Sequence, residues 1–513
     1  MPAPPLSTII ALARAGALDH AWGQFCAAGY DRQDDDPAAL TVKGRLLKDH
    51  ALRASDEGDR RRFYLQSAEA YRRAAALRPA TYPLINAATL SLLSGDRAQA
   101  EEIAREVLER IAREPDEPET PYWRAATEAE ALLLLGRAGE ARIALEAAVA
   151  AAPRAWEDHA STLRQFLIIQ EVLGGEAAWL DMLRPQRSLH YSASAAGDAG
   201  ADRKEAIAAI LREEDVGFGY GALAAGAEIM AAEALLERGA TLHVILPSDA
   251  ESFAARYVDP FAAEWRGRFD AALEAAESIE HVRPLRAPPD DRMTALAHEV
   301  ALGAAMLNAE RLMGEAVALR AGPGEAPSHI RTHAIEAPAQ TDPGAAPPES
   351  RAILLALLAI SVGGGSEEGF EDRLEEVQGV LALAQGAQIA PHLGGDSILI
   401  GYPGPQEAAA AARAIHAQLR AQIPLRIAGH YGLISCVRDP FTGSLRPTES
   451  GAEIVRAIAG AIPPDAVCVS HDFAAVLAAA AGAPSGANWI GELRAFDGGS
   501  PIGLYALRPI TPS

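Results

Sequence analysis

The sequence predicts a multidomain chain in which an all-α region is followed by a parallel α/β region and then by an α+β region. Residues 6–183 have helical periodicity, many alanines and almost no strand signal. Residues 187–321 alternate short apolar runs with helical segments, which is typical of a parallel sheet. Residues 351–513 combine apolar strands, helices and a glycine-rich hairpin. A stretch rich in Pro, Gly and Ala, residues 322–350, predicts a flexible linker between the last two regions.

Size and charge limit the functions that are open to the chain. With 513 residues it is long enough for about three domains. A net charge of -23 argues against nucleic acid and against anionic membrane surfaces as partners. The longest apolar run, residues 352–360, is too short to cross a bilayer. Three isolated cysteines and the lack of a signal-peptide pattern predict a cytoplasmic protein without metal or disulfide framework.

The first region, residues 1–186, repeats a helix, a glycine turn and a second helix three times. The turns fall at Gly16, Gly95 and Gly136, and the last two are 41 residues apart. Small residues on the second helices allow close helix packing. The pattern resembles a tetratricopeptide-type solenoid with irregular spacing. That resemblance implies a concave surface for a protein partner; a helical bundle that packs only on its own chain is the alternative.

Tryptophans in this region are predicted to fill the core. They are Trp22, Trp123, Trp156 and Trp179.

The second region, residues 187–321, predicts a Rossmann-like parallel sheet. A strand over residues 189–192 is followed by a helix, a short strand at 216–218, a glycine-rich loop at 219–226 and a helix over 227–238. Ligands of such sheets bind beyond the carboxyl ends of the strands. Glycines let backbone N–H groups approach a phosphate or ribose, and the following helix offers its positive end.

Six residues near these strand ends are the candidate ligand-binding residues. They are Gly219, Tyr220, Gly221, Gly226, Ser192 and Ser248. Tyr220 could stack on a base, although packing is the favoured role. Glu233, on the helix, is predicted to be solvated or paired with another helix rather than catalytic.

The second region resembles the SLOG superfamily of Rossmann-like domains, which includes relatives of DprA and the LOG enzymes. The resemblance implies a nucleotide-derived ligand that is sensed or processed. The P-G-G-x-G-T-x-x-E pattern of LOG enzymes is absent, and Glu228 and Glu233 do not match its spacing. This argues against a phosphoribohydrolase.

The last region, residues 351–513, carries two short runs around which its strands and helices are arranged. One is Leu-Gly-Gly-Asp-Ser-Ile at residues 393–398, and the other covers residues 426–432. With the strands around them they resemble the catalytic domain of class III adenylate and guanylate cyclases over residues 351–508. The resemblance implies an α+β ferredoxin-like fold, two metal ions held by two carboxylates, and a head-to-tail dimer.

The residues that do chemistry in that family are mostly replaced here. The first metal-binding aspartate corresponds to Leu357, and the hairpin aspartate is kept as Asp396. The asparagine and arginine that stabilise the transition state correspond to Val455 and Ala459. The triphosphate-binding lysine corresponds to Asp497, and the purine-reading lysine to His392. Because each such contact is worth a few kcal/mol, we expect no cyclase activity.

Together these observations predict a non-catalytic signalling sensor or scaffold, a pseudo-cyclase. It would bind a nucleotide-like ligand, a protein partner through the helical repeats, or both, and form a homodimer through the cyclase-like domain. No cofactor or metal follows from the sequence. The alternatives are a weak or heterodimeric nucleotidyl cyclase, a nucleotide-processing SLOG enzyme, and a purely structural assembly protein.

Overall fold

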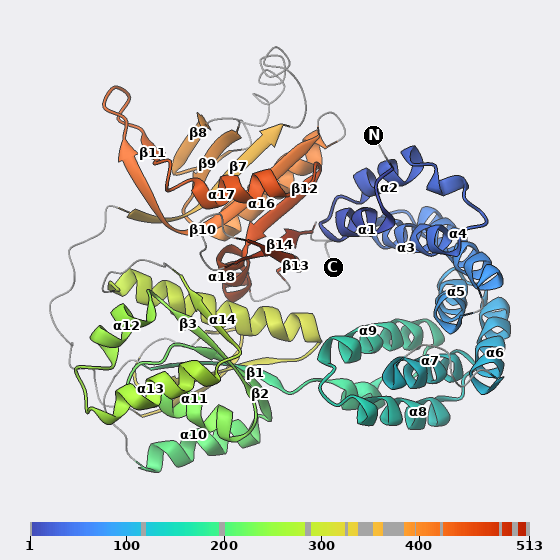
Figure 1. Ribbon diagram of the computed structural model, residues 1–513, viewed down its shortest axis with the longest axis horizontal. Coiled ribbons are helices and arrows are strands. Elements are labelled where there is room, and N and C mark those ends of the chain that lie inside the picture. The colour runs from blue at the N-terminus through green and yellow to red at the C-terminus, as the bar shows by residue number, and fades with distance from the viewer. Residues whose placement is uncertain are drawn as a thin grey trace. The chain divides into compact units, whose positions relative to one another are not determined.

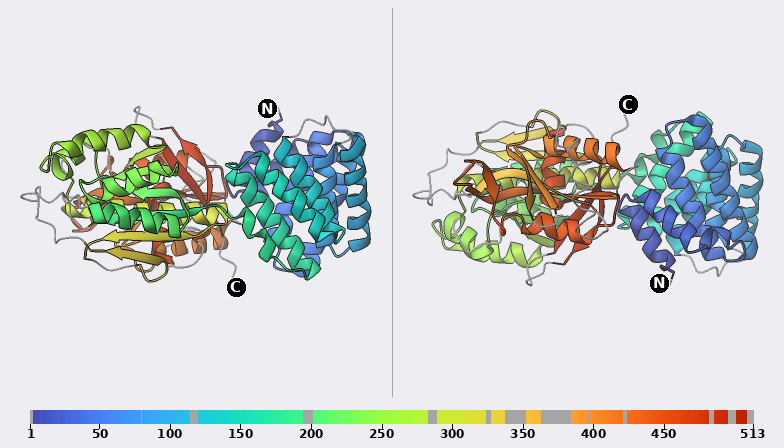
Figure 2. Two further views of the ribbon diagram at one scale, coloured as in Figure 1. Left: turned by 90° about the horizontal axis from the view of Figure 1, so that it is seen from below. Right: turned by 90° about the horizontal axis from the view of Figure 1, so that it is seen from above.

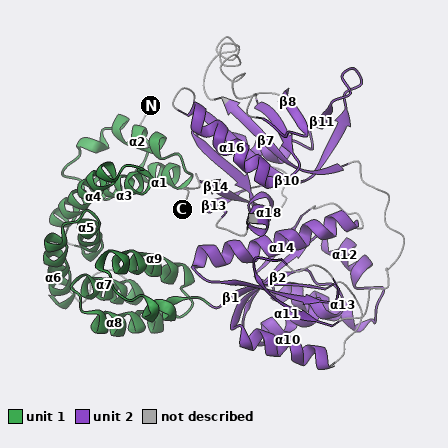
Figure 3. Ribbon diagram, turned by 180° about the vertical axis from the view of Figure 1, so that it is seen from behind, with its two compact units in different colours: residues 1–185 green, residues 186–513 purple. Residues whose placement is uncertain are grey.

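The chain folds into two compact units, residues 1–185 and 186–513 (Figure 3). No helix among the described residues is long and apolar enough to span a membrane. The computed structural model describes residues 3–78, 80–113, 120–193, 201–282, 289–323, 327–336, 352–362, 384–394, 397–420, 424–481, 485–494 and 501–508.

The first unit consists of helices, as its periodicity predicts. Successive helices pack against one another and form an array that is seen from two sides in Figure 2. In Figure 1 the helix α5 lies on the inner side of the arc and α6 on its outer side. The described helices are α1 (Leu6–Arg14), α2 (Leu18–Ala27), η1 (Tyr30–Arg32), α3 (Pro37–Arg53), α4 (Glu57–Leu77), α5 (Thr81–Leu93), α6 (Arg97–Arg113), α7 (Pro121–Leu134), α8 (Ala138–Ala151), α9 (Trp156–Leu173) and η2 (Ala178–Leu183).

One helical pair, α3–α4, has no glycine turn and was not among the three predicted pairs. Its turn instead uses Asp56, whose carboxylate accepts a hydrogen bond from the backbone N–H of Asp59 and so caps α4. The close packing of this pair depends on Gly44, because a Cβ there would overlap the ring of Tyr71. The helical array therefore continues through residues 37–77.

The second unit begins with a six-stranded sheet in which every neighbouring pair is parallel. The order is β4-β3-β2-β1-β5-β6. Strands β2 to β4 are thus added on one side of β1 and strands β5 and β6 on its other side, so the strand order reverses between β1 and β5. This is the switch point at which ligands of open α/β sheets bind. The strands are β1 (Arg187–Ala193), β2 (Val216–Gly221), β3 (Thr241–Leu246), β4 (Ser278–His281), β5 (Ala316–Ala321) and β6 (Arg331–Ile335).

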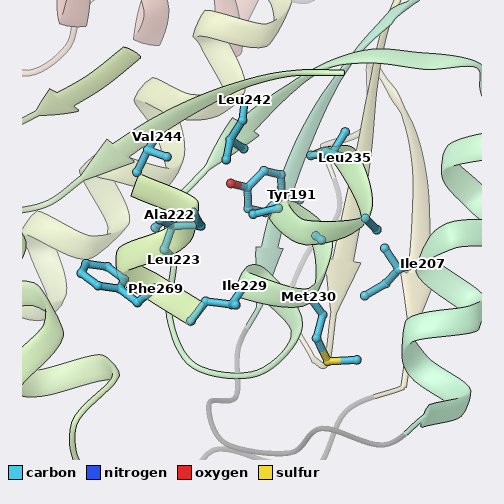
Figure 4. Close-up of a cluster of buried hydrophobic side chains, with 14 of the residues drawn as sticks. Tyr191, Ile207, Ala222, Leu223, Ile229, Met230, Leu235, Leu242, Val244 and Phe269 are labelled. Carbon is cyan, nitrogen blue, oxygen red and sulfur yellow. The ribbon is translucent and has the colours of Figure 1, made fainter. Parts of the chain in front are cut away.

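Helices cover both faces of this sheet. On one face the helices α10, α11, α12 and α13 bury a large apolar cluster, part of which is drawn in Figure 4. On the other face lies α14, whose Asn308 donates a hydrogen bond to the buried Ser188 of β1. The helices are α10 (Ala201–Glu213), α11 (Ala227–Glu237), α12 (Ala250–Tyr257), α13 (Glu264–Ala275) and α14 (Asp291–Leu312).

Strand β6 lies inside the segment for which a flexible linker is predicted. It is held by Glu214, a buried carboxylate that accepts hydrogen bonds from Arg331 at 3.0 Å and from His333 at 2.7 Å. Burial raises the pKa of Glu214, but the bonds from His333 and Arg331 outweigh it and hold that pKa below its usual range. The ordered sheet thus extends to Ile335, beyond the predicted boundary at residue 321.

A second, mostly antiparallel sheet follows, with the order β13-β14-β12-β10-β7-β9-β8 and β11 paired to β10. Strand β10 is central: it pairs with β7 over eleven residues and runs parallel to β12. The strands are β7 (Ala352–Val362), β8 (Ile389–Gly394), β9 (Ser397–Tyr402), β10 (Leu425–Arg438), β11 (Leu445–Pro447), β12 (Ala466–Ser470), β13 (Ala487–Leu493) and β14 (Ile502–Leu507).

Helices α16 (Pro405–Leu419), α17 (Glu453–Ala461) and α18 (His471–Ala481) pack on this sheet. Gly429 of β10 leaves room for Leu358 and for Phe473 of α18, which places Leu358 on the α18 face. Because neighbouring strand residues point to opposite faces, Leu357 lies on the other face.

The two sheets of this unit are joined by a tight crossing of α14 and α18. A Cβ at Gly303 of α14 would overlap the backbone carbonyl of Ala475 in α18. Polar groups line the same junction: His471 lies 3.3 Å from the carboxylate of Glu280 on β4. Burial raises the pKa of the neighbouring Asp472 to about 7, because Glu280 adds to the effect and His471 only partly offsets it.

Candidate functional site

The carboxyl ends of β1, β2, β3 and β5 meet at one edge of the parallel sheet. They bring together the sequence-predicted residues Ser192, Gly221, Gly226 and Ser248. Gly226 has φ +105°, a conformation that disfavours other residues, and it begins α11. Ser248 is fully buried after β3.

The predicted glycine loop is partly a strand. Gly219 and Gly221 belong to β2, where a Cβ would overlap Leu235 and the ring of Tyr191 respectively. Their small size therefore serves packing between β2 and its neighbours. Tyr220 packs too: its ring stacks on His243 of β3 with centroids 4.6 Å apart and planes inclined by 10°.

A buried glutamate, Glu228, takes the backbone donors that a phosphate would use. Its carboxylate accepts hydrogen bonds from the N–H of Ala224 at 2.8 Å and of Ala193 at 3.1 Å. Glu228 is 2% exposed, and burial raises its pKa in spite of these bonds and of the nearby His298. An anion at this spot would have to displace the Glu228 carboxylate.

Two histidines and a tyrosine complete this polar group. His298 of α14 lies 3.9 Å from Glu228, and its ring centroid is 6.3 Å from that of His190. Burial lowers the pKa of His190 to about 3, so its imidazole is neutral at pH 7. The Tyr191 hydroxyl, seen among apolar side chains in Figure 4, has no hydrogen-bond partner in the described part of the chain.

A positive charge stands next to Ser192 across the switch point. Arg320 of β5 is paired with Ser192 in the strand register, and its Nη1 donates to the carbonyl of Gly322 at 2.9 Å. The Nε atom of Arg320 has no partner among the described residues. We call Ser192, Arg320, Glu228 and His298 the switch-point site.

Sequence reasoning missed three of these four residues. Glu228 was considered only against the spacing of a known motif, whereas its bonds join two strand ends that are 31 residues apart along the chain. His298 and Arg320 carry no local signal, because only the strand order brings α14 and β5 beside β1.

Three of the six positions predicted to form a degenerate cyclase site are buried and apolar. Leu357 is 0% exposed, Val455 1% and Ala459 3%, and α17 packs on β7 and β10. His392 is bonded to the carbonyl of Ala390 at 3.1 Å. Asp396 and Asp497 lie outside the described residues.

One polar pair lies next to this apolar group. His430 stands opposite Leu357 in the register of β10 and β7, and its Nδ1 is 2.9 Å from the Ser470 hydroxyl. Burial lowers the pKa of His430 to about 4. The described residues contain no cluster of three or more His, Cys, Asp or Glu side chains that could hold a metal ion.

One comparison with known proteins concerns the N-terminal helices. The family model for Tetratricopeptide Repeats-Sensor (TPR-S) matches residues 7–91. No curated protein matches the sequence. The helical N-terminal region therefore carries tetratricopeptide-like repeats, and the chain as a whole is mixed α/β.

Solved structures of cyclase domains are similar to about a third of the chain. An adenylate/guanylate cyclase/hydrolase from Silicibacter pomeroyi is 20% identical, over 32% of this chain and 100% of that chain, with a TM-score of 0.26. An adenylate cyclase from Trypanosoma brucei is 13% identical, over 31% and 91%, with a TM-score of 0.25. The adenylyl cyclase CyaB from P. aeruginosa is 13% identical, over 31% and 95%, with a TM-score of 0.25.

Proposed function

We propose that this chain is a non-catalytic signalling sensor: it binds a nucleotide-like ligand at the switch-point site and a protein partner through its helical repeats. The observation that carries this proposal is the apolar, buried state of Leu357, Val455 and Ala459. The side chain of Leu357 provides no oxygen ligand for a hard cation, and those of Val455 and Ala459 provide no polar group for a transition state.

The ligand part of the proposal is supported by the charges at the switch point. The Nε–H of Arg320 has no partner among the described residues, and Arg320 stands next to Ser192 in the strand register, which suits a phosphate or ribose oxygen. The Glu228 carboxylate suits a hydrogen-bond donor such as a ribose hydroxyl or a base amino group. A nucleotide offers both kinds of group within one molecule.

The test uses the full-length protein. Native mass spectrometry reports any co-purifying nucleotide, and incubation with ATP or GTP and Mn²⁺ is expected to give no cyclic nucleotide. A panel of nucleotides should include one that raises the melting temperature of the parent but not of Arg320→Ala. Arg238→Ala, at the far end of α11 from Glu228, is the matched control and should keep the shift. Formation of cyclic nucleotide above a protein-free blank would contradict the proposal that the chain is non-catalytic. If no nucleotide of the panel raises the melting temperature, the proposal of a nucleotide-like ligand is contradicted.

A second candidate is a nucleotide-processing enzyme at the same site. It is favoured by the buried Glu228 and its 3.9 Å approach to His298, a pairing that can serve proton transfer. Chromatography of the same incubations separates the two candidates. A product that forms with the parent and not with Glu228→Gln would replace the sensor by an enzyme.

The proposal includes self-association through the cyclase-like domain. Support comes from the hairpin of β10 and β11, where Phe441 is 95% exposed and Val437 54% exposed. Exposed apolar groups of this kind are usually covered by a partner. Sedimentation of the full chain at tens of micromolar should show a dimer that Phe441→Asp weakens. A monomer under these conditions would contradict self-association through this domain. A dimer alone does not distinguish the sensor from a purely structural assembly protein, which would also dimerise without a ligand.

A further inference from the structure

A cavity lies among the first helices of the first unit. Its volume is about 550 Å³, and it is lined by residues of α2, α3 and α4 and of the connection between α2 and α3. Its apolar walls come from all three helices; they are Trp22, Leu40, Leu47, Leu65 and Ala70. Ligand pockets usually measure about 300–1,000 Å³ and are mostly apolar with a few polar groups, so this cavity has the size and lining of a small-molecule site.

Two tryptophans of the first unit differ from the prediction that they fill the core. Trp22 packs on the apolar cluster that contains Ile9 and Phe25, but it also lines the cavity. Trp123 is 36% exposed, so for Trp123 the prediction is wrong. Trp22 therefore contributes an aromatic wall to the cavity as well as a contact to the core.

The connection between α2 and α3 gives the cavity its polar end. It covers residues 28–36 and includes η1, whereas four residues join α8 to α9. The hydroxyl of Tyr30 donates to the carbonyl of Pro4 at 3.1 Å, and Asp34 forms an ion pair of 3.2 Å with Arg73 of α4. The connection is therefore fixed at two points, and its polar side chains have defined positions at the cavity.

The carboxylate of Asp31 in this connection accepts no hydrogen bond in the described part of the chain. Its Oδ1 atom is buried and without a partner, and its Oδ2 atom lies 3.8 Å from Nε of Arg32. The Asp31 side chain is 29% exposed and lines the cavity. Because a largely buried carboxylate without a hydrogen bond is costly, a donor that enters the cavity and bonds to Asp31 would be bound favourably.

A positive charge lies beside this carboxylate. Lys43 of α3 lines the cavity, and its ammonium donates to the backbone carbonyl of Asp31 at 2.8 Å. An ammonium has three N–H groups, so two more can donate to an acceptor in the cavity. Burial raises the pKa of the nearby Cys26 thiol, Asp31 adds to this effect and Lys43 partly offsets it, so both charges act on the same part of the cavity.

We propose that this cavity binds a zwitterionic small molecule with a large apolar group, of the class of apolar amino acids and their dipeptides. The ammonium of the ligand bonds to the Asp31 carboxylate, and its carboxylate bonds to the Lys43 ammonium. The apolar group packs on the walls, where Trp22 provides an aromatic face. This site is separate from the switch-point site and adds a second ligand, of different chemistry, to the proposed function.

The experiment uses the full-length protein and a panel of apolar L-amino acids and dipeptides. We expect at least one member to raise the melting temperature, and titration calorimetry then measures its affinity. Asp31→Asn and Lys43→Met should each weaken binding at least tenfold. Asp35→Asn, at an exposed position of the same connection that does not line the cavity, is the matched control and should change affinity less than twofold. Circular dichroism checks that each variant is folded.

Changes to the ligand give a test that does not depend on the folding of variants. N-acetylation removes the ammonium of the ligand and should weaken binding to the parent at least tenfold. The acetylated ligand should bind Asp31→Asn and the parent equally, because the bond that this substitution removes is already lost. Amidation of the ligand carboxylate should have the matching relation to Lys43→Met.

The reactivity of Cys26 reports whether the ligand occupies this cavity. Cys26 lines the cavity and is partly buried, and Cys436 of the second unit is also partly buried and serves as the internal reference. The ligand should slow the alkylation of Cys26 by iodoacetamide at least fivefold and leave that of Cys436 unchanged. Peptide mass spectrometry measures both rates.

The other outcomes contradict the inference. If no member of the panel raises the melting temperature or protects Cys26, the cavity does not bind this class of molecule. If a member binds without protecting Cys26, it binds elsewhere. Equal affinity for the free and the acetylated ligand would contradict the bond to Asp31. Protection of Cys26 by a nucleotide, and by no zwitterion, would assign the cavity to a different class of ligand.

Discussion

Two regions of the second unit differ in the polarity of their buried side chains. At the carboxyl edge of the parallel sheet, Glu228 and His190 are buried and ionisable, and Glu228 accepts hydrogen bonds from two backbone N–H groups. In the second sheet and its helix α17, the residues Leu357, Val455 and Ala459 are buried and apolar. The first site retains polar groups that are expensive to bury, and the second does not.

The two regions therefore differ in what their buried side chains contribute to the free energy of folding. A buried carboxylate costs free energy unless bonds satisfy it, so its presence at Glu228 calls for a structural or binding role. Buried apolar side chains such as Leu357 have the opposite effect, because they add to the core on which the sheet depends. The three apolar side chains therefore contribute to the stability of the second sheet.

The largest effect is expected when a carboxylate is placed at Leu357. Leu357→Asp would place an unpaired acid at a fully buried position, and we expect a loss of about 4 kcal/mol or more in the free energy of unfolding. Urea denaturation measures this loss. Leu357→Met, which keeps volume and polarity, should cost less than about 1.5 kcal/mol. A Leu357→Asp variant as stable as the parent would mean that the site is open rather than filled.

A smaller loss is expected at the polar site. Glu228→Ala leaves the N–H groups of Ala193 and Ala224 without their acceptor, which should cost about 2–4 kcal/mol. The matched control on the same helix is Glu233→Ala: Glu233 is paired with Arg268 at 2.6 Å but is partly exposed, so about 1 kcal/mol or less is expected. Urea denaturation measures the loss in the free energy of unfolding. Equal losses for the two variants would mean that the hydrogen bonds of Glu228 to the backbone do not stabilise the fold more than a surface ion pair does.

The smallest effect depends on pH and concerns Asp472, which burial leaves with a pKa of about 7 against 3.8 when free. The native state thus binds more protons than the unfolded state between about pH 4 and pH 7, and stability falls as pH rises through this window. We expect Asp472→Asn to be more stable than the parent at pH 8, by about 1–2 kcal/mol. Its advantage should shrink towards pH 5. An advantage that does not change with pH would show that Asp472 is charged in the folded protein.

Much of the architecture follows from short-range sequence patterns. Apolar runs predict β1, β3, β7 and β12 to within a few residues, because buried parallel and central strands are continuously apolar. Glycine turns locate three of the helical pairs. The pair α3–α4 is missed because its turn depends on a capping aspartate, Asp56, and not on a glycine. Strand β6 is missed because a distant buried residue, Glu214, holds it.

The sites are harder to predict than the elements. The alternation of strands with helices predicts a parallel sheet. Because the carboxyl ends of parallel strands meet at one edge of a sheet, Ser192 and Gly221 are expected at that edge. The same reasoning does not predict Arg320 or His298 at this edge. They lie there because α14 crosses the sheet and places β5 next to β1. The structure shows that Leu357 is completely buried, but its correspondence to a catalytic aspartate stays a prediction. The assignments for Asp396 and Asp497 remain predictions.

The crossing at Gly303 bears on how such a protein can be assembled from parts during evolution. The sequence divides the chain at a proline-rich stretch, but the helix that precedes this stretch, α14, is in backbone contact with α18 beyond it. A gene fragment that begins after the stretch would therefore encode a domain with one helix face bare. Exchange of this domain between proteins requires that α14, or a helix with the same small residues, travels with it.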